Sequence, residues 1–313
     1  MSIENTLIEE AYRRLLEREP ESHAVVEMHA RNAISYEQFL LQITASEEYQ
    51  NLVLMRGLRK LSLASTQSVQ VDVTDAVLLQ LMDRVKREWQ RLGESDPYWS
   101  VLSEERYRSK NLTGEELLDF LARGRHSAEL IDSFEALTGQ TVPNGTCFEL
   151  GCGVGRVTSH LAKRFERVIA ADISPGNIAL CKRNLESLGV ANVEYLLIND
   201  LADYSAQAEF DFLYSVIVLQ HNTPPIQKFI LESLLAKIRF KGGCLFQTPS
   251  TLQNYSFDAQ RYLATEDQLI EMHALPMADV FKLLSRHRLI PLQVVMDSWT
   301  GSPGSYTYFA LKG

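Results

Sequence analysis

The sequence contains few cysteines, and none has the spacing of a metal site or of a disulfide framework. The four are Cys147, Cys152, Cys181 and Cys244, and no two of them form a CxxC motif. Zinc sites and disulfide-rich scaffolds need several cysteines at short, regular spacings. We therefore expect reduced, buried thiols, no metal ion and no disulfide framework.

Long hydrophobic runs and a surplus of positive charge are also missing. No apolar stretch approaches the ~18 residues of a membrane-spanning helix, and the N-terminus is polar and acidic, unlike a secretory signal. Lys and Arg number 31 against 40 Asp and Glu, giving a formal net charge of −9. Nucleic-acid binding depends on Lys and Arg that neutralise phosphates. We therefore expect a cytoplasmic protein with no membrane span and no nucleic-acid partner.

A glycine loop between a strand and a helix is the most informative feature that is present. The apolar run 146–150 stops at Gly151, and Gly153 and Gly155 follow at alternate positions before an amphipathic segment begins at Val157. Strand, tight glycine turn and helix form the entry unit of nucleotide-binding α/β folds, because a backbone without Cβ atoms can lie against a ligand. The loop therefore predicts a nucleotide-like cofactor.

Apolar strand patterns alternate with helical ones from this loop to the C-terminus. The last two strand patterns have no long helix between them, which predicts an antiparallel hairpin at the sheet edge. The pattern as a whole predicts an α/β fold with a seven-stranded, mostly parallel, Rossmann-like sheet. The predicted strands are 146–150, 167–172, 193–198, 210–217, 243–248, 291–296 and 305–311.

The chain divides into three parts by composition and periodicity. Residues 1–62 are helical in pattern, and we expect them to form an accessory domain. Residues 63–92 read as a linker followed by a connecting helix, since a Ser- and Gln-containing stretch precedes a helical apolar stripe. Residues 93–313 are expected to form the α/β domain.

Two cofactors fit a glycine loop, a dinucleotide and S-adenosylmethionine. A dinucleotide loop needs a third small residue where this chain has Arg156. Glu149 would repel a pyrophosphate but attract the sulfonium and ammonium groups of S-adenosylmethionine. Asp172 ends the next strand about twenty residues after the first glycine, where such folds bind ribose hydroxyls. The charge pattern favours S-adenosylmethionine.

The segment Glu149–Arg156, with Asp172, Asp200 and residues 215–221, resembles class I S-adenosylmethionine-dependent methyltransferases. The resemblance covers about residues 93–313. It implies that the glycine loop lies along the methionine part of the cofactor, that Asp172 holds the ribose, and that Asp200 faces the adenine amine. The expected cofactor-binding residues are Glu149, Gly151, Cys152, Gly153, Arg156, Asp172, Ile173, Asp200, Leu201, Ser215, Val216 and Gly124.

His221 is the candidate catalytic residue. Methyl transfer from a sulfonium needs alignment, desolvation and, for an alcohol acceptor, a base. His221 follows the fourth strand directly, and histidine has the pKa of a base that works near neutral pH. The alternative is a loop histidine that packs near the cofactor or caps the helix after Pro225. Tyr98, Trp99, Gln220 and Tyr255 are the expected acceptor contacts.

The acceptor is narrowed by missing motifs and by a second resemblance. Neither the Asn/Asp-Pro-Pro-aromatic turn of amino-methylating nucleic-acid enzymes nor a cysteine after proline is present. Residues 12–20, with Tyr36, Phe39-Leu40 and 46–49, resemble a small helical domain that accompanies bacterial surface-glycan enzymes. That resemblance favours O-methylation of a saccharide or other small-molecule cell-envelope precursor. It also suggests a homodimer, or docking to a biosynthetic partner through the N-terminal helices.

Other functions stay open at this point. One is N- or O-methylation of a protein or an unrelated small metabolite. Another is a nicotinamide-dependent oxidoreductase, against which Arg156 argues. A third is a non-catalytic scaffold that keeps a methyltransferase fold, although an intact glycine loop speaks against decay of the site.

Overall fold

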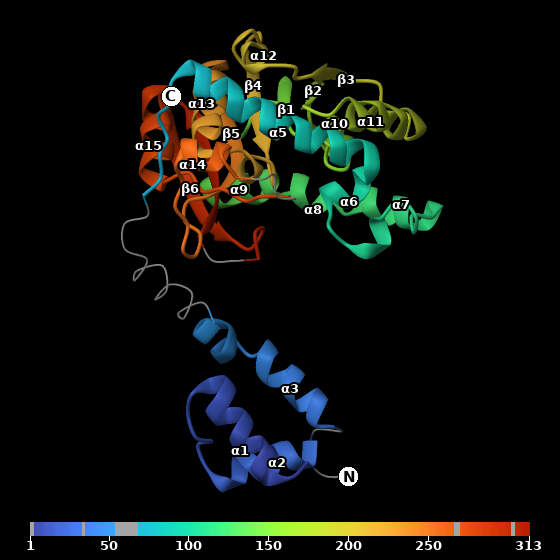
Figure 1. Ribbon diagram of the computed structural model, residues 1–313. Helices are drawn as coiled ribbons and strands as arrows, with labels where there is room; N and C mark the ends of the chain where they lie inside the picture. Colours follow the sequence, from blue (N-terminus) through green and yellow to red (C-terminus); the bar gives the residue numbers. More distant parts are fainter. Residues whose placement is uncertain (1–2, 33–34, 54–67, 266–269, 302–303) are drawn as a thin grey trace. The chain divides into compact units, whose positions relative to one another are not determined.

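The computed structural model describes residues 3–32, 35–53, 68–265, 270–301 and 304–313. The chain forms two compact units, Met1–Ser65 and Thr66–Gly313, shown with their elements in Figure 1. Each unit has a hydrophobic core of its own. Among the described helices, none has both the length and the apolar character needed to cross a membrane.

The first unit is helical, as predicted. Ser35 caps its α3 helix by accepting a hydrogen bond from the Gln38 amide at 3.2 Å, and Phe39 and Ile8 are fully buried in its core. Apolar residues that precede Pro20, such as Tyr12 and Leu16, supply much of this core. The elements with printed bounds are α1 (Asn5–Ala11), the π-helical turn η1 (Tyr12–Leu16), α2 (His23–Asn32) and α3 (Tyr36–Ala45).

The second unit begins with helices. A capping box opens α7, where the Thr113 hydroxyl accepts from the Glu116 amide at 3.3 Å and the Glu116 carboxylate accepts from the Thr113 amide at 3.1 Å. These leading elements are α5 (Asp75–Ser95), α6 (Pro97–Val101), η2 (Glu105–Tyr107), α7 (Gly114–Ala122), α8 (Gly124–Ala128) and α9 (Leu130–Thr138).

A seven-stranded sheet follows, in the order β3-β2-β1-β4-β5-β7-β6. The first five strands are parallel to their neighbours, and β7 lies antiparallel between β5 and β6. The prediction of a seven-stranded, mostly parallel sheet with an antiparallel hairpin is confirmed. The strands are β1 (Thr146–Leu150), β2 (Arg167–Asp172), β3 (Val193–Leu197), β4 (Phe210–Ser215), β5 (Ile238–Pro249), β6 (Leu289–Asp297) and β7 (Ser305–Lys312).

Strand β5 begins earlier than the predicted residue 243. Ile238 already pairs with Phe210, and an irregularity in register separates this pair from the next one, Phe212 with Gly243. The charged residues Arg239 and Lys241 interrupt the apolar run there, so the start of the strand is not visible in the hydrophobic pattern.

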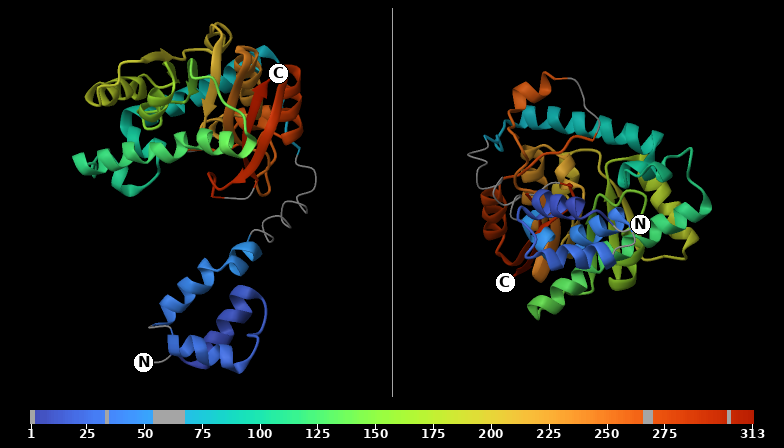
Figure 2. Two further views of the ribbon diagram at one scale, coloured as in Figure 1. Left: turned by 180° about the vertical axis from the view of Figure 1, so that it is seen from behind. Right: turned by 90° about the horizontal axis from the view of Figure 1, so that it is seen from below.

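Helices cover both faces of the sheet in this unit (Figures 1 and 2). One face packs α9, α10 (Thr158–Arg164) and α11 (Pro175–Ser187) through β-strand side chains such as Cys147 and Val168. The other face, with Phe148 and Leu150, packs the remaining layer. That layer contains α5, α12 (Leu201–Ser205), α13 (Pro224–Ala236) and α15 (Met277–Arg286), while the short η3 (Leu219–His221) and α14 (Ala259–Leu263) lie in connections.

Helix α5 belongs to the core of the second unit. Leu81, Met82 and Val85 of this helix are buried against the sheet and α13. We expected the α/β domain to begin at residue 93, but α5 crosses that boundary without a break. The reason is that its apolar stripe needs a packing partner, and the sheet provides it. Val69 pairs with Phe257 in a parallel bridge, so part of the expected linker also lies along this unit. Residues 63–67 of that linker lie outside the described residues.

Candidate functional site

A cavity of about 950 Å³, including its open mouth, lies at the carboxyl ends of β1, β2 and β4. Strand β1 sits between β2 and β4, so the strand order reverses there, and open α/β sheets bind ligands at such points. The wall is formed by Val85, Trp89, Ser100, Val101, Glu149, Leu150, Gly151, Cys152, Gly153, Arg156, Val157, Asp172, Ile173, Asn177, Ile198, Tyr204, Tyr214, Val216, Ile217, Val218, His221, Asn222 and Ile230.

The glycine loop forms one wall of this cavity. Gly151 and Gly153 have positive φ values of 75° and 54°, a conformation that side chains with a Cβ rarely adopt. A Cβ on Gly151 would lie 2.3 Å from Val218 Cγ2, and one on Gly153 would lie 2.7 Å from Val101 Cγ2. Both positions therefore require glycine, and the loop keeps its backbone exposed toward the cavity.

Asp172 joins the end of β2 to the glycine loop. Leu150 pairs with Ala171 across β1 and β2, so the residues that follow come together at the sheet edge. The Asp172 carboxylate accepts from the Gly153 amide at 2.9 Å and from the Ser174 amide at 2.8 Å. Burial raises the pKa of Asp172, and the two amides oppose this rise because they favour the ionised form.

Glu149 lies on the cavity floor with an unsatisfied carboxylate oxygen. Its side chain is 3% exposed, and among the described residues Oε2 has no hydrogen-bond partner. Burial raises the pKa of Glu149 to about 7, although the Thr158 hydroxyl and the Arg156 guanidinium favour the ionised form. A buried carboxylate of this kind is costly unless a positive group meets it. The floor therefore suits a cationic ligand.

Eight of the twelve expected cofactor residues line the cavity: Glu149, Gly151, Cys152, Gly153, Arg156, Asp172, Ile173 and Val216. The other four lie outside its wall. Asp200 is exposed and caps α12 by accepting from the Ala202 amide at 2.7 Å, and Leu201 is buried in the core. Ser215 donates to the Leu150 carbonyl at 3.3 Å and so joins β4 to β1.

Gly124 allows a close approach of two elements instead of lining the cavity. A Cβ at this position would lie 1.9 Å from the Arg156 carbonyl oxygen, so a larger residue would push α8 away from the glycine loop. The Arg156 guanidinium in turn donates to the Arg123 carbonyl at 3.2 Å. Gly124 therefore supports the position of Arg156, which does line the cavity.

His221 also lines the cavity, from η3. Its Nδ1 donates to the Glu271 carbonyl at 3.0 Å, which leaves the lone pair on Nε2, and Gln220 Nε2 donates to that atom at 3.2 Å. The ring centroid lies 4.9 Å from that of Trp89. Burial lowers the pKa of His221 to about 4. The imidazole is therefore neutral at pH 7 and weakly basic.

The four expected acceptor contacts do not lie in the cavity wall. Tyr98 packs edge-on against Phe120 in a separate core cluster, and Trp99 lies under the Arg108 guanidinium, 3.5 Å from its ring centroid. Gln220 accepts from Gln247 Nε2 at 3.0 Å. Tyr255 shares a 3.0 Å hydrogen bond with His273 Nδ1. Each side chain is occupied by packing or polar partners that the sequence pattern does not reveal.

Several wall residues were not among those expected from the sequence. Val85 and Trp89 come from α5, and Ser100 and Val101 come from α6. Trp89 stands out in the sequence only as one member of a helical apolar stripe. No local signal tells that this stripe crosses the edge of the sheet.

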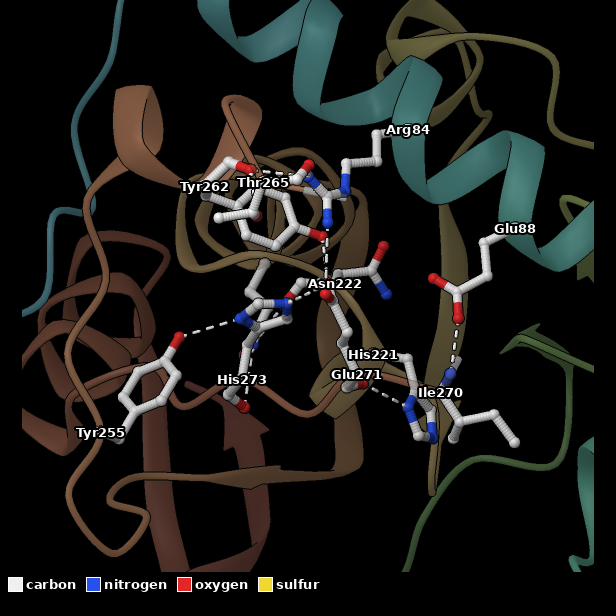
Figure 3. A network of polar contacts seen from close by, with 11 residues as sticks. Arg84, Glu88, His221, Asn222, Tyr255, Tyr262, Thr265, Ile270, Glu271 and His273 are labelled. Carbon is white, nitrogen blue, oxygen red and sulfur yellow. Dashed lines mark hydrogen bonds and ion pairs between the residues drawn. The ribbon is translucent and has the colours of Figure 1, made fainter. Parts of the chain in front are cut away.

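Helix α5 is held at the cavity by a group of polar contacts that we call the clamp, made by Arg84, Glu88, Tyr262, Ile270 and Glu271 (Figure 3). Arg84 is 3% exposed and donates to the Tyr262 carbonyl at 2.6 Å. It also pairs with Glu271 Oε1 at 3.2 Å. Glu88 accepts from the Ile270 amide at 2.5 Å. Since Glu271 also binds His221, the clamp connects α5 to η3.

Comparison with known proteins shows that the part of the chain around the cavity is similar to methyltransferases. Residues 148–242 match the family model described as a methyltransferase domain. A segment of 59 residues is 41% identical to a protein of Methanobrevibacter smithii described as a probable cobalt-precorrin-6B C(15)-methyltransferase (decarboxylating), over 18% of this chain and 30% of that protein. A segment of 152 residues is 27% identical to a tRNA/tmRNA (uracil-C(5))-methyltransferase of Neisseria meningitidis, over 44% of this chain and 38% of that protein. The chain therefore spans about a third of the length of these curated relatives.

Solved structures share the fold. The magnesium protoporphyrin IX methyltransferase of Synechocystis, solved with bound S-adenosylhomocysteine (SAH), is 15% identical and superposes with a TM-score of 0.51. The similarity covers 73% of this chain and all of that one. At this identity the similarity shows a common fold.

Proposed function

We propose that the chain is a methyltransferase that uses S-adenosylmethionine. The observation that carries the proposal is one cavity that joins the glycine loop, the Asp172 carboxylate and the unsatisfied oxygen of Glu149. A floor on which Glu149 Oε2 has no hydrogen-bond partner among the described residues fits a ligand with sulfonium and ammonium groups. The match of residues 148–242 to the methyltransferase domain model supports the same cofactor.

Each of these residues would contact a different part of S-adenosylmethionine. Glu149 would meet its positive groups, the backbone of Gly151–Gly153 would lie along it without obstruction, and Asp172 would accept from the ribose hydroxyls. When bound, the cofactor supplies an activated methyl group. The protein contributes alignment and a dry surrounding, which are the main requirements of an in-line displacement.

His221 is the proposed base for an alcohol acceptor. Its Nδ1 proton is held on the Glu271 carbonyl, so the lone pair is on Nε2, where Gln220 donates in this structure and an acceptor hydroxyl would take its place. Its low pKa keeps that lone pair unprotonated at neutral pH but limits the proton affinity it offers. We therefore propose that orientation and removal of a proton late in the transfer, more than strong basicity, are its contribution.

For the acceptor we propose a saccharide or other small-molecule precursor of the cell envelope, methylated on oxygen. The wall beside the glycine loop, with Val101, Val157 and Val218, is apolar, as is typical of small-molecule sites. The resemblance of the N-terminal helices to a domain that accompanies surface-glycan enzymes supports the saccharide.

We further propose a role for the first unit and a location for the protein. The helices of residues 1–62 would mediate dimerisation or docking to a biosynthetic partner. Their compact core, built on residues such as Ile8 and Phe39, supports an independent binding module. The acidic composition and reduced thiols support a cytoplasmic location.

Titration calorimetry with S-adenosylmethionine and with SAH tests the cofactor assignment. We expect saturable binding of both, and at least tenfold weaker binding to an Asp172→Ala variant because charge-assisted hydrogen bonds to the ribose are lost. SAH release in the presence of saccharide acceptors then tests turnover. Absence of binding to either ligand would overturn the proposed function, and unchanged affinity of the Asp172→Ala variant would overturn the ribose contact.

A further inference from the structure

We infer that helix α5 is a cover for the adenosine half of the cofactor and that Trp89 is the residue that contacts it. The inference rests on the proposed function and adds to it a binding residue from outside the glycine-loop fold unit. It follows from where α5 lies, from what holds it there, and from what Trp89 faces.

Three contacts place α5 over the ends of the strands that surround the expected adenosine site. Gln90 Nε2 donates to the Ile173 carbonyl at 3.4 Å, directly after the Asp172 carboxylate. Lys86 Nζ donates to the Asn199 carbonyl at 2.7 Å, just beyond the end of β3. Trp89 lies between these two residues on the helix and also borders the cavity. Its indole therefore lies near the carboxyl ends of β2 and β3, on the Asp172 side of the cavity.

The ring of Trp89 packs against another residue of the cavity wall. His221, which follows β4, packs against Trp89 at a centroid distance of 4.9 Å and an interplanar angle of 54°. Burial lowers the pKa of His221 to about 4, so the neighbour is uncharged at neutral pH. An indole in contact with a neutral ring offers a flat, apolar surface, and adenine stacks well on such surfaces.

The C-terminal end of α5 is fixed by close packing on α11. A Cβ on Gly93 would lie 2.0 Å from Ser174 Oγ, and a Cβ on Gly176 would lie 2.7 Å from the Gly93 carbonyl oxygen. The two glycines let the helix touch the start of α11, next to Asp172. Contact at this closeness leaves α5 little freedom to slide along the cavity.

The middle of α5 is fixed by the clamp (Figure 3). Arg84 and Glu88 are 3% and 8% exposed, and both bind residues of the segment between β5 and β6. Glu271 of that segment also accepts from His221. The clamp thus holds the indole of Trp89 and the imidazole of His221 in one unit, so the cover and the proposed base keep their relative positions.

A fluorescence titration tests the contact directly. The chain has three tryptophans, so a Trp99→Phe/Trp299→Phe variant keeps Trp89 as its only one. In this variant we expect SAH and adenosine to change the Trp89 emission saturably and methionine to leave it unchanged. A response to methionine without a response to adenosine would overturn the inference, as would SAH binding detected by calorimetry with no change in emission.

Affinity measurements complete the test. We expect Trp89→Ala to bind SAH about tenfold more weakly than the unmodified chain, and Trp89→Phe to retain most of the affinity, because stacking on an aromatic ring is the lost contact. Trp99→Phe is the matched control, since Trp99 lies outside the cavity wall, and should bind unchanged. Circular dichroism checks the fold of each variant, and Trp89→Phe with the fluorescence titration decides the matter if Trp89→Ala does not fold. Unchanged affinity of a folded Trp89→Ala variant overturns this inference alone, whereas loss of SAH binding by the unmodified chain overturns the proposed function.

Discussion

Glu149 and Asp172 show how two buried carboxylates acquire different roles from their hydrogen-bond partners. Asp172 has both carboxylate oxygens bound by backbone amides, so it shapes the loop as well as bordering the cavity. Glu149 is equally buried but keeps one oxygen without a partner among the described residues. Oδ2 of Asp172 thus accepts from one amide and can accept one more hydrogen bond, whereas Oε2 of Glu149 has its whole capacity left for a ligand.

The raised pKa of Glu149 makes cofactor affinity depend on pH. A cationic ligand binds the ionised carboxylate. Because the pKa of Glu149 is about 7, the carboxyl group is mostly protonated below neutral pH and must lose its proton before the ligand binds. We expect the affinity for S-adenosylmethionine to rise as pH increases through 7, by up to about tenfold per pH unit below that value. Calorimetry at pH 6 and pH 8 measures the difference.

A Glu149→Gln variant is the matched control for this dependence. It keeps the size of the side chain and removes the titrating group. Its affinity should be lower at pH 8 and should no longer change with pH through this range. An unchanged pH dependence in the variant would assign the titration to another group.

At the scale of elements, α5 is the helix whose contacts decide the shape of the cavity. Its apolar stripe enters the core, while Arg84 and Glu88 lie buried at its side in the clamp. The described part of the segment between β5 and β6 contributes the partners of α5, through Tyr262, Ile270 and Glu271.

Removing the charge of Arg84 should destabilise the second unit strongly. An Arg84→Met variant leaves the half-buried Glu271 carboxylate with the Tyr262 hydroxyl but without its guanidinium partner, and we expect a loss of about 2–4 kcal/mol, somewhat below that of a fully buried pair. Denaturant unfolding measures the free energy. Lys282→Met removes the exposed pair with Asp279 and should change stability by less than about 1 kcal/mol. A similar effect of both substitutions would show that the clamp contributes little.

At the scale of the whole molecule, the two units have separate cores. The core of the first unit is built from α1 to α3 and the turn between α1 and α2, and the core of the second from the sheet and its helices. All residues that line the cavity belong to the second unit. The described wall of the cavity is therefore built from the second unit.

A chain of residues 66–313 should fold and bind SAH with the affinity of the full protein, within about twofold. Its core and its cavity wall contain no residue of the first unit. Thermal unfolding monitored by circular dichroism and calorimetric titration with SAH check the two parts of this prediction. A large loss of SAH affinity in a folded 66–313 chain would mean that the first unit contributes to the site.

The sequence alone determined the strands, the glycine loop and the acidic residues beside it. Apolar runs of strand length, alternating glycines and carboxylates at strand ends are local sequence patterns. Parallel strands bring their carboxyl ends to one edge of the sheet. For this reason Glu149, Gly151, Gly153 and Asp172 could be placed at the cavity before the fold was known, and the structure has them there.

Only the tertiary structure decided which other side chains meet the cavity. Tyr98, Gln220 and Asp200 have the residue types of binding groups, but each has a partner within the protein. Tyr98 donates to the Asn184 side chain, Gln220 accepts from Gln247, and Asp200 caps the start of α12. Trp89 has the pattern of a core residue, yet its helix crosses the ends of β2 and β3. The partners of a side chain come from segments far apart in sequence, such as Arg84 and Glu271, and packing of the whole unit selects them.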